Sequence, residues 1–366
     1  PTSTAGLYKI LGDRLFEGRS RPRHLPSSGR DLALVELSTI KRLGPRVLQG
    51  VPRAVRSSNV FIGPFSYQPP MKVLITGGSG QLASYLFEEM SSEHDVTGVD
   101  IRAPVHRPAM GRVAKADIRD LDAMTAAGQG CDVIVHTAAQ VSVQRSTEDP
   151  SGDADTNVMG TIAVLRAAAA AGVKKFVYIS SAAAYGDPQR VPVDEDHPLM
   201  PKSFYGASKL CGEHYVRAFG STFGLKWIVI RPFNFYSPRA DPLSPYSGVI
   251  TKFAQAVRDG RPLRIEGDGL QTRDFLHARD VARMVSMAVT SEVSDQTFNC
   301  GSGRGTSIKE LAETFSTIFP GKVTVEHAPP RTSDIRDSVA EVSRARRLLD
   351  FETRVGLEEG LRGFFD

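Results

Sequence analysis

Two residues that could transfer a proton, Tyr205 and Lys209, stand four positions apart in the chain. In a helix this spacing places the phenol and the ammonium on the same face. A free tyrosine has a pKa of about 10, which is too high for a base at neutral pH, and a neighbouring ammonium lowers that pKa. We therefore expect Tyr205 to act as a catalytic base and Lys209 to stabilise its phenolate, although many exposed helices carry the same pair without any function.

A third candidate, Ser181, follows an apolar segment of strand length that ends at Ile179. In a parallel sheet with helices on both faces, residues at the carboxyl ends of the strands point into the ligand crevice. We therefore expect the hydroxyl of Ser181 to point into this crevice as a third member of the catalytic group. The alternative is an ordinary turn residue at the end of a strand.

A glycine motif, Gly78-x-Gly80-x-x-Ala83, lies between an apolar segment and a helical pattern, which is the context of a dinucleotide-binding turn. Glycines let the backbone approach the phosphates, and the helix N-terminus offers free N–H groups. Asp100 ends the next apolar segment, where a carboxylate accepts hydrogen bonds from ribose hydroxyls and disfavours a 2′-phosphate. We therefore expect NAD in preference to NADP, and the neighbouring Arg102 weakens this preference. A dinucleotide together with a proton-transfer pair indicates a redox enzyme.

The elements that must position these residues follow from the hydrophobic pattern. Segments that are apolar on both faces and separated by helices indicate a parallel sheet covered by helices on both sides. The expected fold class is α/β, a doubly wound, Rossmann-like parallel sheet with a smaller C-terminal lobe. The expected strands are 72–76, 95–99, 132–136, 175–179 and 226–230, and the expected helices include 81–92, 156–171 and 206–222.

Three parts of the chain are expected. Residues 1–70 form a basic extension without helix or strand periodicity, which we interpret as a disordered tail, an over-extended start or an Arg-rich transit peptide. Residues 71–237 form the NAD-binding domain, and residues 273–300 return to it. Residues 238–366 form the substrate-binding lobe, because their pattern is looser and richer in Pro and Gly.

Composition narrows the class of protein. A content of 41% hydrophobic and 23% charged residues suits one large or two small globular domains. No apolar run reaches the ~18–20 residues of a membrane helix, so no membrane partner is expected. The excess of basic residues belongs to residues 1–70, which carry no nucleic-acid-binding signature, so no nucleic acid partner is expected. Three cysteines without CxxC spacing predict neither disulfides nor a metal site, and they suit a cytoplasmic location.

Taken together, the motifs resemble the extended short-chain dehydrogenase/reductase family. The closest likeness within this NAD-dependent epimerase/dehydratase group is to nucleotide-sugar 4-epimerases of the UDP-glucose 4-epimerase type. The resemblance covers about residues 71–366. Besides the motifs above, it is carried by Thr76-Gly77-Gly78-Ser79-Gly80, Asp117-Ile118, His136-Thr137-Ala138-Ala139, Asn157-Val158-Met159-Gly160-Thr161, Ser180-Ser181, Arg231-Pro232-Phe233-Asn234, Gly267-Asp268-Gly269 and Phe298-Asn299-Cys300-Gly301.

The resemblance implies a role for individual residues. Ser181 would bind the reacting sugar hydroxyl, Tyr205 would be the base, and Lys209 would hold the nicotinamide ribose. The implied cofactor-binding residues are Gly77, Gly80, Gln81, Leu82, Asp100, Asp117, Ile118, Ala138, Asn157, Tyr205 and Lys209. The implied substrate-binding residues are Ser142, Ser181, Asn234, Arg273, Arg331, Asp334 and Ser338.

The reaction is chosen by the residues that follow Ser181. Related dehydratases and decarboxylases carry acidic residues there, whereas this chain has Ala182 and Ala183, which cannot act as acid or base. The resemblance therefore implies reversible oxidation at C4 of a nucleoside-diphosphate sugar, which is an epimerisation through a 4-keto intermediate. The alternatives are an NAD(P)-dependent dehydrogenase or 4-ketoreductase of a nucleotide sugar or sugar acid and, further away, a non-catalytic NAD-binding scaffold.

Two expectations concern the substrate and the partner. In the epimerases that this chain resembles, the residue seven positions after the diphosphate-binding arginine lines the sugar pocket, and a bulky Tyr there excludes an N-acetyl group. Counted from Arg331 this residue is the small Ser338, so the resemblance implies UDP-N-acetylhexosamines as substrates beside UDP-glucose and UDP-galactose. Ser237 departs from a glycine that is common in the family, so the following loop is expected to differ. The resemblance also implies a homodimer through helices near 156–171 and 206–222.

Overall fold

The computed structural model describes residues 69–241, 248–330 and 335–365 of the 366-residue chain. These residues belong to one compact unit, Gln68–Asp366. The expected basic extension, apart from Pro69 and Pro70, lies outside the described residues.

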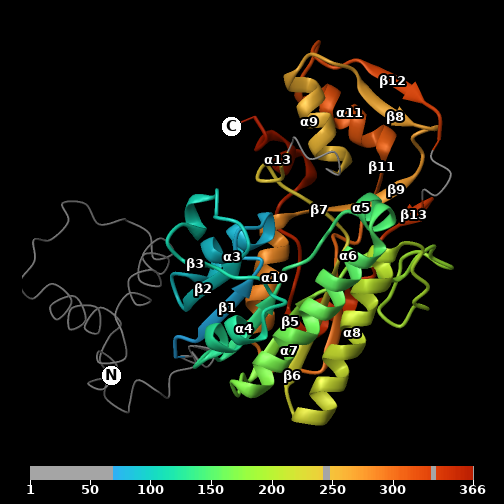
Figure 1. Cartoon of the computed structure of the whole chain (residues 1–366). Helices are drawn as coiled ribbons and strands as arrows, with labels where there is room; N and C mark the ends of the chain where they lie inside the picture. The colour runs from blue at the N-terminus through green and yellow to red at the C-terminus, as the bar shows by residue number, and fades with distance from the viewer. Residues whose placement is uncertain (1–68, 242–247, 331–334, 366) are drawn as a thin grey trace, which may run out of the picture. The chain divides into compact units, whose positions relative to one another are not determined.

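A seven-stranded sheet of parallel strands forms the larger part of this unit (Figure 1). The chain runs from β1 outward to β2 and β3 and then crosses to β4 on the other side of β1, so the strand order reverses between β1 and β4. This reversal is the point where doubly wound sheets bind ligands. In spatial order the strands are β10 (Gln296–Cys300), β6 (Lys226–Pro232), β5 (Lys175–Ile179), β4 (Val133–His136), β1 (Lys72–Thr76), β2 (Asp95–Asp100) and β3 (Val113–Lys115).

The fold class expected from the sequence is confirmed, and each expected strand is present with its ends shifted by at most two residues. Neither edge strand was among the expected strands. Strand β3, Val113–Lys115, is too short to show a period, and β10, Gln296–Cys300, was expected only as part of the returning segment 273–300.

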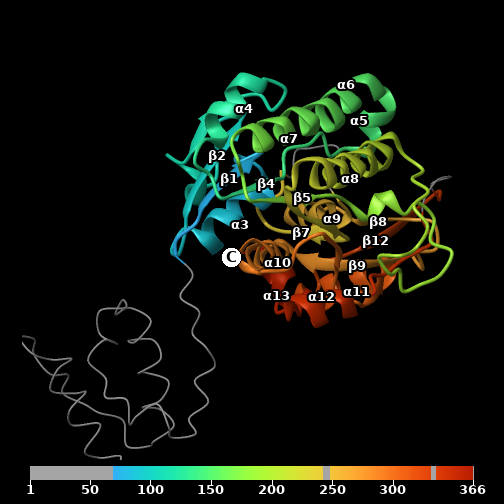
Figure 2. The same cartoon turned by 90° about the horizontal axis from the view of Figure 1, so that it is seen from below.

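Helices cover both faces of the sheet, as Figure 2 shows. Alternate residues of β1 face different layers, so Val73 and Ile75 pack in one core cluster and Leu74 in the other. Each fully buried side chain of this kind contributes about 1.5–3 kcal/mol to stability. The first layer holds α3 (Gln81–Met90) and α10 (Ala278–Thr290), and the second holds α4 (Leu121–Gly128), α7 (Gly160–Ala170) and α8 (Phe204–Phe223).

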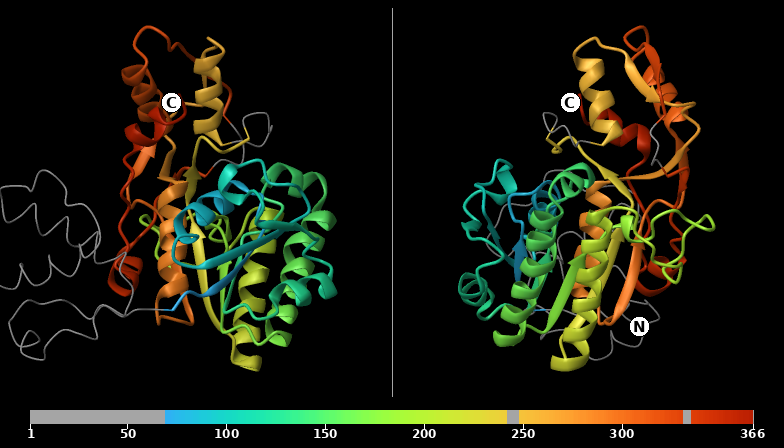
Figure 3. Two further views of the ribbon diagram at one scale, coloured as in Figure 1. Left: turned by 90° about the vertical axis from the view of Figure 1, so that its left-hand side faces the viewer. Right: turned by 45° about the vertical axis from the view of Figure 1, so that its right-hand side comes forward.

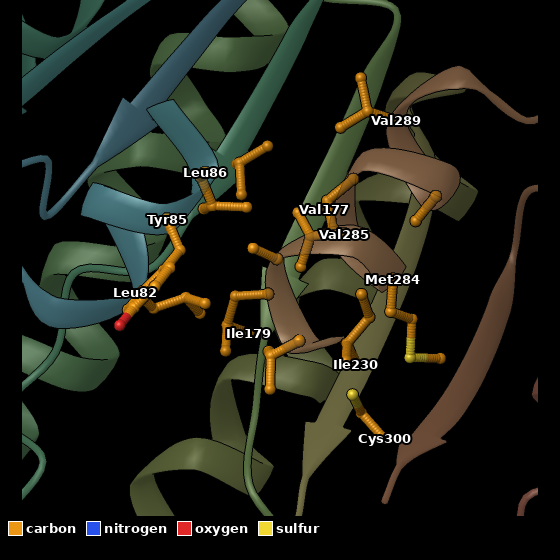
Figure 4. Close-up of a cluster of buried hydrophobic side chains, with 14 of the residues drawn as sticks. Leu82, Tyr85, Leu86, Val177, Ile179, Ile230, Met284, Val285, Val289 and Cys300 are labelled. Atoms are coloured by element: carbon orange, nitrogen blue, oxygen red, sulfur yellow. The ribbon is translucent and has the colours of Figure 1, made fainter. Parts of the chain in front are cut away.

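Figure 4 shows the first of these cores, in which α3 and α10 meet the strands. Leu82 and Leu86 of α3 lie opposite Met284 and Val285 of α10, and Ile230 of β6 lies beside Met284. This packing holds the first turn of α3 firmly at the end of β1.

Two expected helices differ from the pattern. The helix expected over 156–171 starts as a π-helix, η4 (Asp155–Met159), before it continues as α7. Such π-turns are rare and often occur at functional sites. The helix expected over 206–222 runs from Phe204 to Phe223, since the Ser203 hydroxyl accepts from the Gly206 amide at one end and Gly224 takes a left-handed conformation, with φ +70°, at the other.

A smaller lobe stands over the carboxyl ends of the strands (Figure 3). Its core is built from three helices packed against short strands. The strands are β7 (Asn234–Tyr236), β9 (Thr272–His277), β11 (Gly305–Ser307) and β13 (Asp337–Ser338) in one sheet and β8 (Leu263–Glu266) with β12 (Val325–Ala328) in another. The helices are α9 (Val249–Arg258), α11 (Ile308–Ile318) and α13 (Leu357–Arg362).

The chain passes between the two parts more than once. Strand β10 pairs with β6, and α12 (Ser343–Leu349) packs against β10 and α10 with Ala345 and Leu349 in the larger core. Strand β9, by contrast, pairs within the lobe sheet. Within the described residues, no helix is long and apolar enough to cross a membrane.

Candidate active site

The glycine turn after β1 is shaped for close approach. Gly77 has a left-handed conformation, with φ +69°, and a Cβ there would stand 2.8 Å from the Cα of Ala138. Ala138 follows β4, so the two turns meet where the strand order reverses. Gly80 caps α3 without a side chain, and no acidic residue lies in the first turn of that helix. The backbone N–H groups at this helix end therefore fit a pyrophosphate.

Asp100, at the end of β2, turns its carboxylate back onto the glycine turn. Its Oδ2 accepts from the Ser79 amide at 3.1 Å and its Oδ1 from the Arg102 amide at 2.9 Å. Each carboxylate oxygen has a further lone pair, so both can still accept from ribose hydroxyls. The guanidinium of Arg102 is largely exposed and 3.9 Å from Asp100. The turn, the helix end and the carboxylate fit a dinucleotide without a 2′-phosphate.

The first two residues of α3, Gln81 and Leu82, point to different surroundings. Leu82 is buried in the core, whereas the side chain of Gln81 donates to the Ser237 hydroxyl at 2.8 Å. Ser237 also accepts from the Arg239 amide, and the Arg239 guanidinium stacks on the Tyr85 ring. Ser237 thus ties the start of α3 to the chain that enters the lobe.

Asp117 and Ile118, expected beside the adenine, lie on the loop after β3. Ile118 is buried against Gly160, the first residue of α7. Asp117 accepts from Arg119, whose guanidinium also binds Asp155, and the Arg119 hydrogen bond holds the pKa of Asp117 below its usual value.

Asn157, on the π-helix η4, is buried and fixes the loop after β4. Its Oδ1 accepts from the Gln140 amide at 2.8 Å and its Nδ2 donates to the Gln140 carbonyl at 2.9 Å. The same Nδ2 reaches Asp153 and the Ser208 hydroxyl. Ser142, expected at the substrate, is buried and caps α5 (Val143–Glu148) by accepting from the Arg145 amide.

Tyr205 and Ser181 lie next to each other in the structure. Their hydroxyls hydrogen-bond each other, and the Tyr205 amide is held by the Ser146 hydroxyl at 3.1 Å. Burial raises the pKa of Tyr205 to about 12, while the Ser181 hydrogen bond acts in the opposite direction. A phenolate at neutral pH therefore needs a positive charge close to it.

Lys209, one helical turn after Tyr205, is the cation at this place. It is 2% exposed, and its Nζ stands 4.3 Å from the centre of the Tyr178 ring. Burial lowers the pKa of Lys209 to about 7, and the carboxylates of Glu213 and Asp153 raise it. The charge of this lysine is thus poised near neutral pH.

A buried ionic network that the sequence reading missed lies behind the pair. Glu213, one turn after Lys209, accepts from the Ser180 hydroxyl and from two nitrogens of Arg231. Arg231 also donates to the Tyr185 hydroxyl, which in turn hydrogen-bonds Asn299 of β10. The spacing from Lys209 to Glu213 is a helical one and could have signalled the carboxylate, whereas Arg231 offered no such signal.

Three expected substrate residues lie on neighbouring strands of the lobe. Asn234 begins β7 and is exposed, and in the sheet register Ser338 of β13 stands directly beside Arg273 of β9. Arg273 also donates to the Thr272 carbonyl. The two other expected residues, Arg331 and Asp334, lie outside the described residues. The described ranges hold no cluster of His, Cys, Asp or Glu that could bind a metal ion.

Fold and site together define a doubly wound dinucleotide-binding protein in which Ser181, Tyr205 and Lys209 gather at the carboxyl edge of the sheet. The chain belongs to the NAD dependent epimerase/dehydratase family, whose model matches residues 73–301. The resemblance inferred from the motifs is thereby confirmed, and so is NAD as the cofactor of the family.

Two curated relatives illustrate the similarity. A UDP-glucose 4-epimerase of Mycolicibacterium smegmatis is 37% identical over 302 residues, which are 80% of this chain and 96% of that protein. A putative UDP-glucose 4-epimerase of Methanocaldococcus jannaschii is 32% identical over 296 residues, with coverage of 79% and 96%.

Solved structures agree with these relatives. The UDP-glucose 4-epimerase of Thermotoga maritima, solved with UDP-glucose, is 32% identical and has a TM-score of 0.76 over 81% of this chain and 98% of its own. The UDP-N-acetylglucosamine 4-epimerase of Methanobrevibacter ruminantium, solved with UDP-N-acetylmuramic acid, is 28% identical and has a TM-score of 0.76 over 81% and 99%.

Proposed function

We propose that this chain is an NAD-dependent epimerase that inverts C4 of a nucleoside-diphosphate sugar. The observation that carries the proposal is the hydrogen-bonded pair of Ser181 and Tyr205, with buried Lys209 one helical turn away. Ala182 and Ala183, which follow Ser181 in a short 3-10 helix, supply no second acid or base, so elimination or decarboxylation lacks its catalyst.

Each residue of this group has a distinct role in the proposal. Tyr205 removes the proton of the C4 hydroxyl, Ser181 orients that hydroxyl, and Lys209 stabilises the phenolate. NAD, when bound, takes up the C4 hydride and returns it. The glycine turn, from Gly77 to Leu82, and Asp100 would hold the cofactor, together with Asp117, Ile118, Ala138 and Asn157.

Inversion requires the 4-keto sugar to present its opposite face before reduction. An anchor at the diphosphate leaves the sugar free to rotate, and arginines suit phosphate oxygens because their fork stays charged. In the proposal Asn234, Arg273 and Arg331 grip the diphosphate, and Ser142 and Asp334 line the substrate. The division of the chain at residue 237 into a cofactor domain and a substrate lobe is part of the same proposal.

The sugar is proposed to be glucose, galactose or an N-acetyl form of either, carried by UDP. The position of Ser338 beside Arg273 supports this, since a small side chain next to a phosphate-binding arginine leaves room for an acetamido group. The similarity to both a UDP-glucose and a UDP-N-acetylglucosamine 4-epimerase points the same way.

A homodimer and a cytoplasmic location complete the proposal. Helix α8 exposes Phe204, Tyr215 and Phe223, which share one stripe of the helix, and α7 packs beside it. An apolar stripe of this kind favours pairing with a second copy. On α7, which belongs to the helix expected in the dimer interface, Ala167 and Ala168 are buried in the core. The three cysteines form no disulfide, which suits a reducing compartment.

One experiment tests the proposed reaction. Purified protein incubated with UDP-galactose, without added NAD, should form UDP-glucose until the two sugars reach equilibrium. The same assay with UDP-N-acetylgalactosamine tests the N-acetyl sugars. Stoichiometric reduction of added NAD without any epimer would identify a dehydrogenase, and no turnover at all would indicate a scaffold.

A further inference from the structure

Lys209 needs a negative charge close by if it is to stay protonated. A buried ammonium without a counter-charge loses its proton, because the low dielectric disfavours the charged form. Lys209 is almost fully buried and contacts the face of the uncharged Tyr178 ring. Across the described ranges it forms no direct ion pair with a carboxylate.

Glu213, the nearest carboxylate along α8, is already neutralised. Its Oε1 accepts from Ser180 and from Arg231 Nε at 2.6 and 2.8 Å. Its Oε2 accepts from Arg231 and Arg217 at 2.7 and 3.0 Å. Buried Arg231 and the partly exposed Arg217 thus share this one carboxylate, so Glu213 is already paired before Lys209 is considered.

Asp153 is the second buried carboxylate of this region, on α6 (Pro150–Ala154), and it is 2% exposed. Its Oδ1 accepts from Gln140 Nε2 at 2.9 Å and from Asn157 Nδ2 at 3.1 Å. Its Oδ2 is buried, and no described residue hydrogen-bonds it. Since Asn157 Nδ2 also reaches Ser208, the neighbour of Lys209, the carboxylate is linked to the very turn of α8 that carries the lysine.

We propose that Asp153 is the counter-charge of Lys209 and thereby acts as a positioning residue that keeps the lysine protonated beside Tyr205. The proposal rests on the proposed function only in taking Tyr205 as the catalytic base and Lys209 as the residue that stabilises its phenolate. Asp153 itself need not touch the sugar or the cofactor.

Other ionisable groups around Lys209 do not supply this charge. His136 of β4 is held neutral, since burial, followed by the charge of Lys209, lowers its pKa to about 3. Burial raises the pKa of Tyr178 of β5 well above its usual value, so this ring is also neutral. Asp155 on η4 is half exposed and paired with Arg119. The remaining charged side chains of α5, α7 and the loop before α6 are exposed, namely Arg145, Glu148, Asp149 and Arg166.

The expected electrostatic effect has a definite sign. The negative charge of Asp153 raises the pKa of Lys209 against burial, and it also adds to the burial that raises the pKa of Tyr205. Removing it lowers both values. In Asp153→Asn the lysine loses its proton at lower pH, and both limbs of the pH profile of kcat/KM move toward acid. A merely structural role would lower the rate without moving the profile.

The direct test follows Lys209 itself. In full-length protein as purified, the 13Cε signal of Lys209 is titrated by NMR, and the signal is assigned with Lys209→Met. In Asp153→Asn, whose amide oxygen can still accept from Gln140 and Asn157, the proton dissociation constant of Lys209 should rise about tenfold or more. An unchanged titration in folded Asp153→Asn would overturn the proposal, even if activity were lost.

A matched control removes the same charge from the same helical stretch. Asp155→Asn, two positions further on and half exposed, should leave the titration of Lys209 unchanged. If Asp155→Asn shifted the pKa of Lys209 as much as Asp153→Asn does, the proposal would be overturned, because the effect would then not be specific to Asp153.

A second measurement covers the case in which Asp153→Asn does not fold alone. In a Lys209→Met background Asp153 is a buried charge without its partner, so adding Asp153→Asn should raise the melting temperature. A fall would overturn the proposal. Neither the titration of Lys209 nor the melting temperature depends on turnover. A chain that fails to epimerise UDP-galactose would therefore refute the proposed function without deciding this inference.

Discussion

At the scale of single residues, the site combines a phenol that rarely ionises with a lysine that is partly protonated at neutral pH. Burial holds the pKa of Tyr205 at about 12 and lowers that of Lys209 to about 7. Burial disfavours both charged forms, the phenolate of Tyr205 and the ammonium of Lys209. The two charges stabilise each other, because a phenolate in this place is stable only beside an ammonium. Ser181 contributes a hydrogen bond that favours the phenolate.

Replacing the phenol tests this chemistry. Tyr205→Phe should lower turnover by at least ~10²–10⁴, since the described residues place no second base beside Ser181. The Tyr205 amide, not its hydroxyl, binds Ser146, so the melting temperature and the amount of NAD retained should stay near those of the wild type. Near-normal turnover would remove Tyr205 from the mechanism.

Ser338 tests substrate size. Ser338→Tyr should abolish epimerisation of the N-acetyl sugar by steric exclusion and spare the plain hexose, as measured by kcat/KM for both. Ser343→Tyr, at the exposed first residue of α12, is the control and should affect neither substrate. Equal loss of both activities in Ser338→Tyr, or no loss of either, would contradict the assignment of Ser338 to the sugar pocket.

At the scale of elements, α8 and the end of β5 divide the work between neighbouring residues. Ser180 turns toward Glu213 and the buried network, while Ser181 turns toward Tyr205. Glu213 and Arg231 therefore fix α8 against β5 and β6. This also fixes the positions of Lys209 and Tyr205, which lie one and two turns earlier on α8.

Breaking this network should cost stability. Arg231→Ala leaves Glu213 as a buried carboxylate without its main partner, so we expect the free energy of unfolding to fall by about 3–5 kcal/mol. Arg217→Ala removes a half-exposed partner of the same carboxylate and should cost about 1 kcal/mol or less. Equilibrium unfolding in urea measures both, and equal losses would contradict a buried pair between Glu213 and Arg231.

At the scale of the whole molecule, the order of segments decides where the lobe stands. Strand β6 ends at Pro232 and β7 begins at Asn234, so the chain enters the lobe at the carboxyl edge of the sheet. It returns through α10, which packs on the seven-stranded sheet, and β10, which pairs with β6 in that sheet. The chain thus crosses between the sheet and the lobe more than once.

The oligomeric state is open to a direct measurement. Sedimentation at micromolar concentration should give twice the 39.7 kDa mass of the chain, because the apolar stripe of α8 is exposed in one copy. Phe223→Glu should shift the protein toward the monomer, and Phe319→Glu, which would damage the lobe core instead, separates dissociation from unfolding. A monomer mass for the wild type would refute the dimer.

The extension is expected to add nothing to the folded domain. A chain that starts at Met71 should show the same melting temperature and activity as the full chain, because β1 begins at Lys72 and the described core is made by later residues. A melting temperature lower by several degrees would contradict this expectation.

The sequence by itself determined what depends on neighbours along the chain. The period of apolar residues predicted the strands, the glycines predicted the turn after β1, and helical spacing paired Tyr205 with Lys209. Only the tertiary structure decided what depends on contacts between distant segments. It placed Asp153 of α6 where its charge acts on Lys209 of α8, and it set Ser338 beside Arg273. No local pattern encodes such pairs, because burial and charge balance arise only when the separate elements pack together.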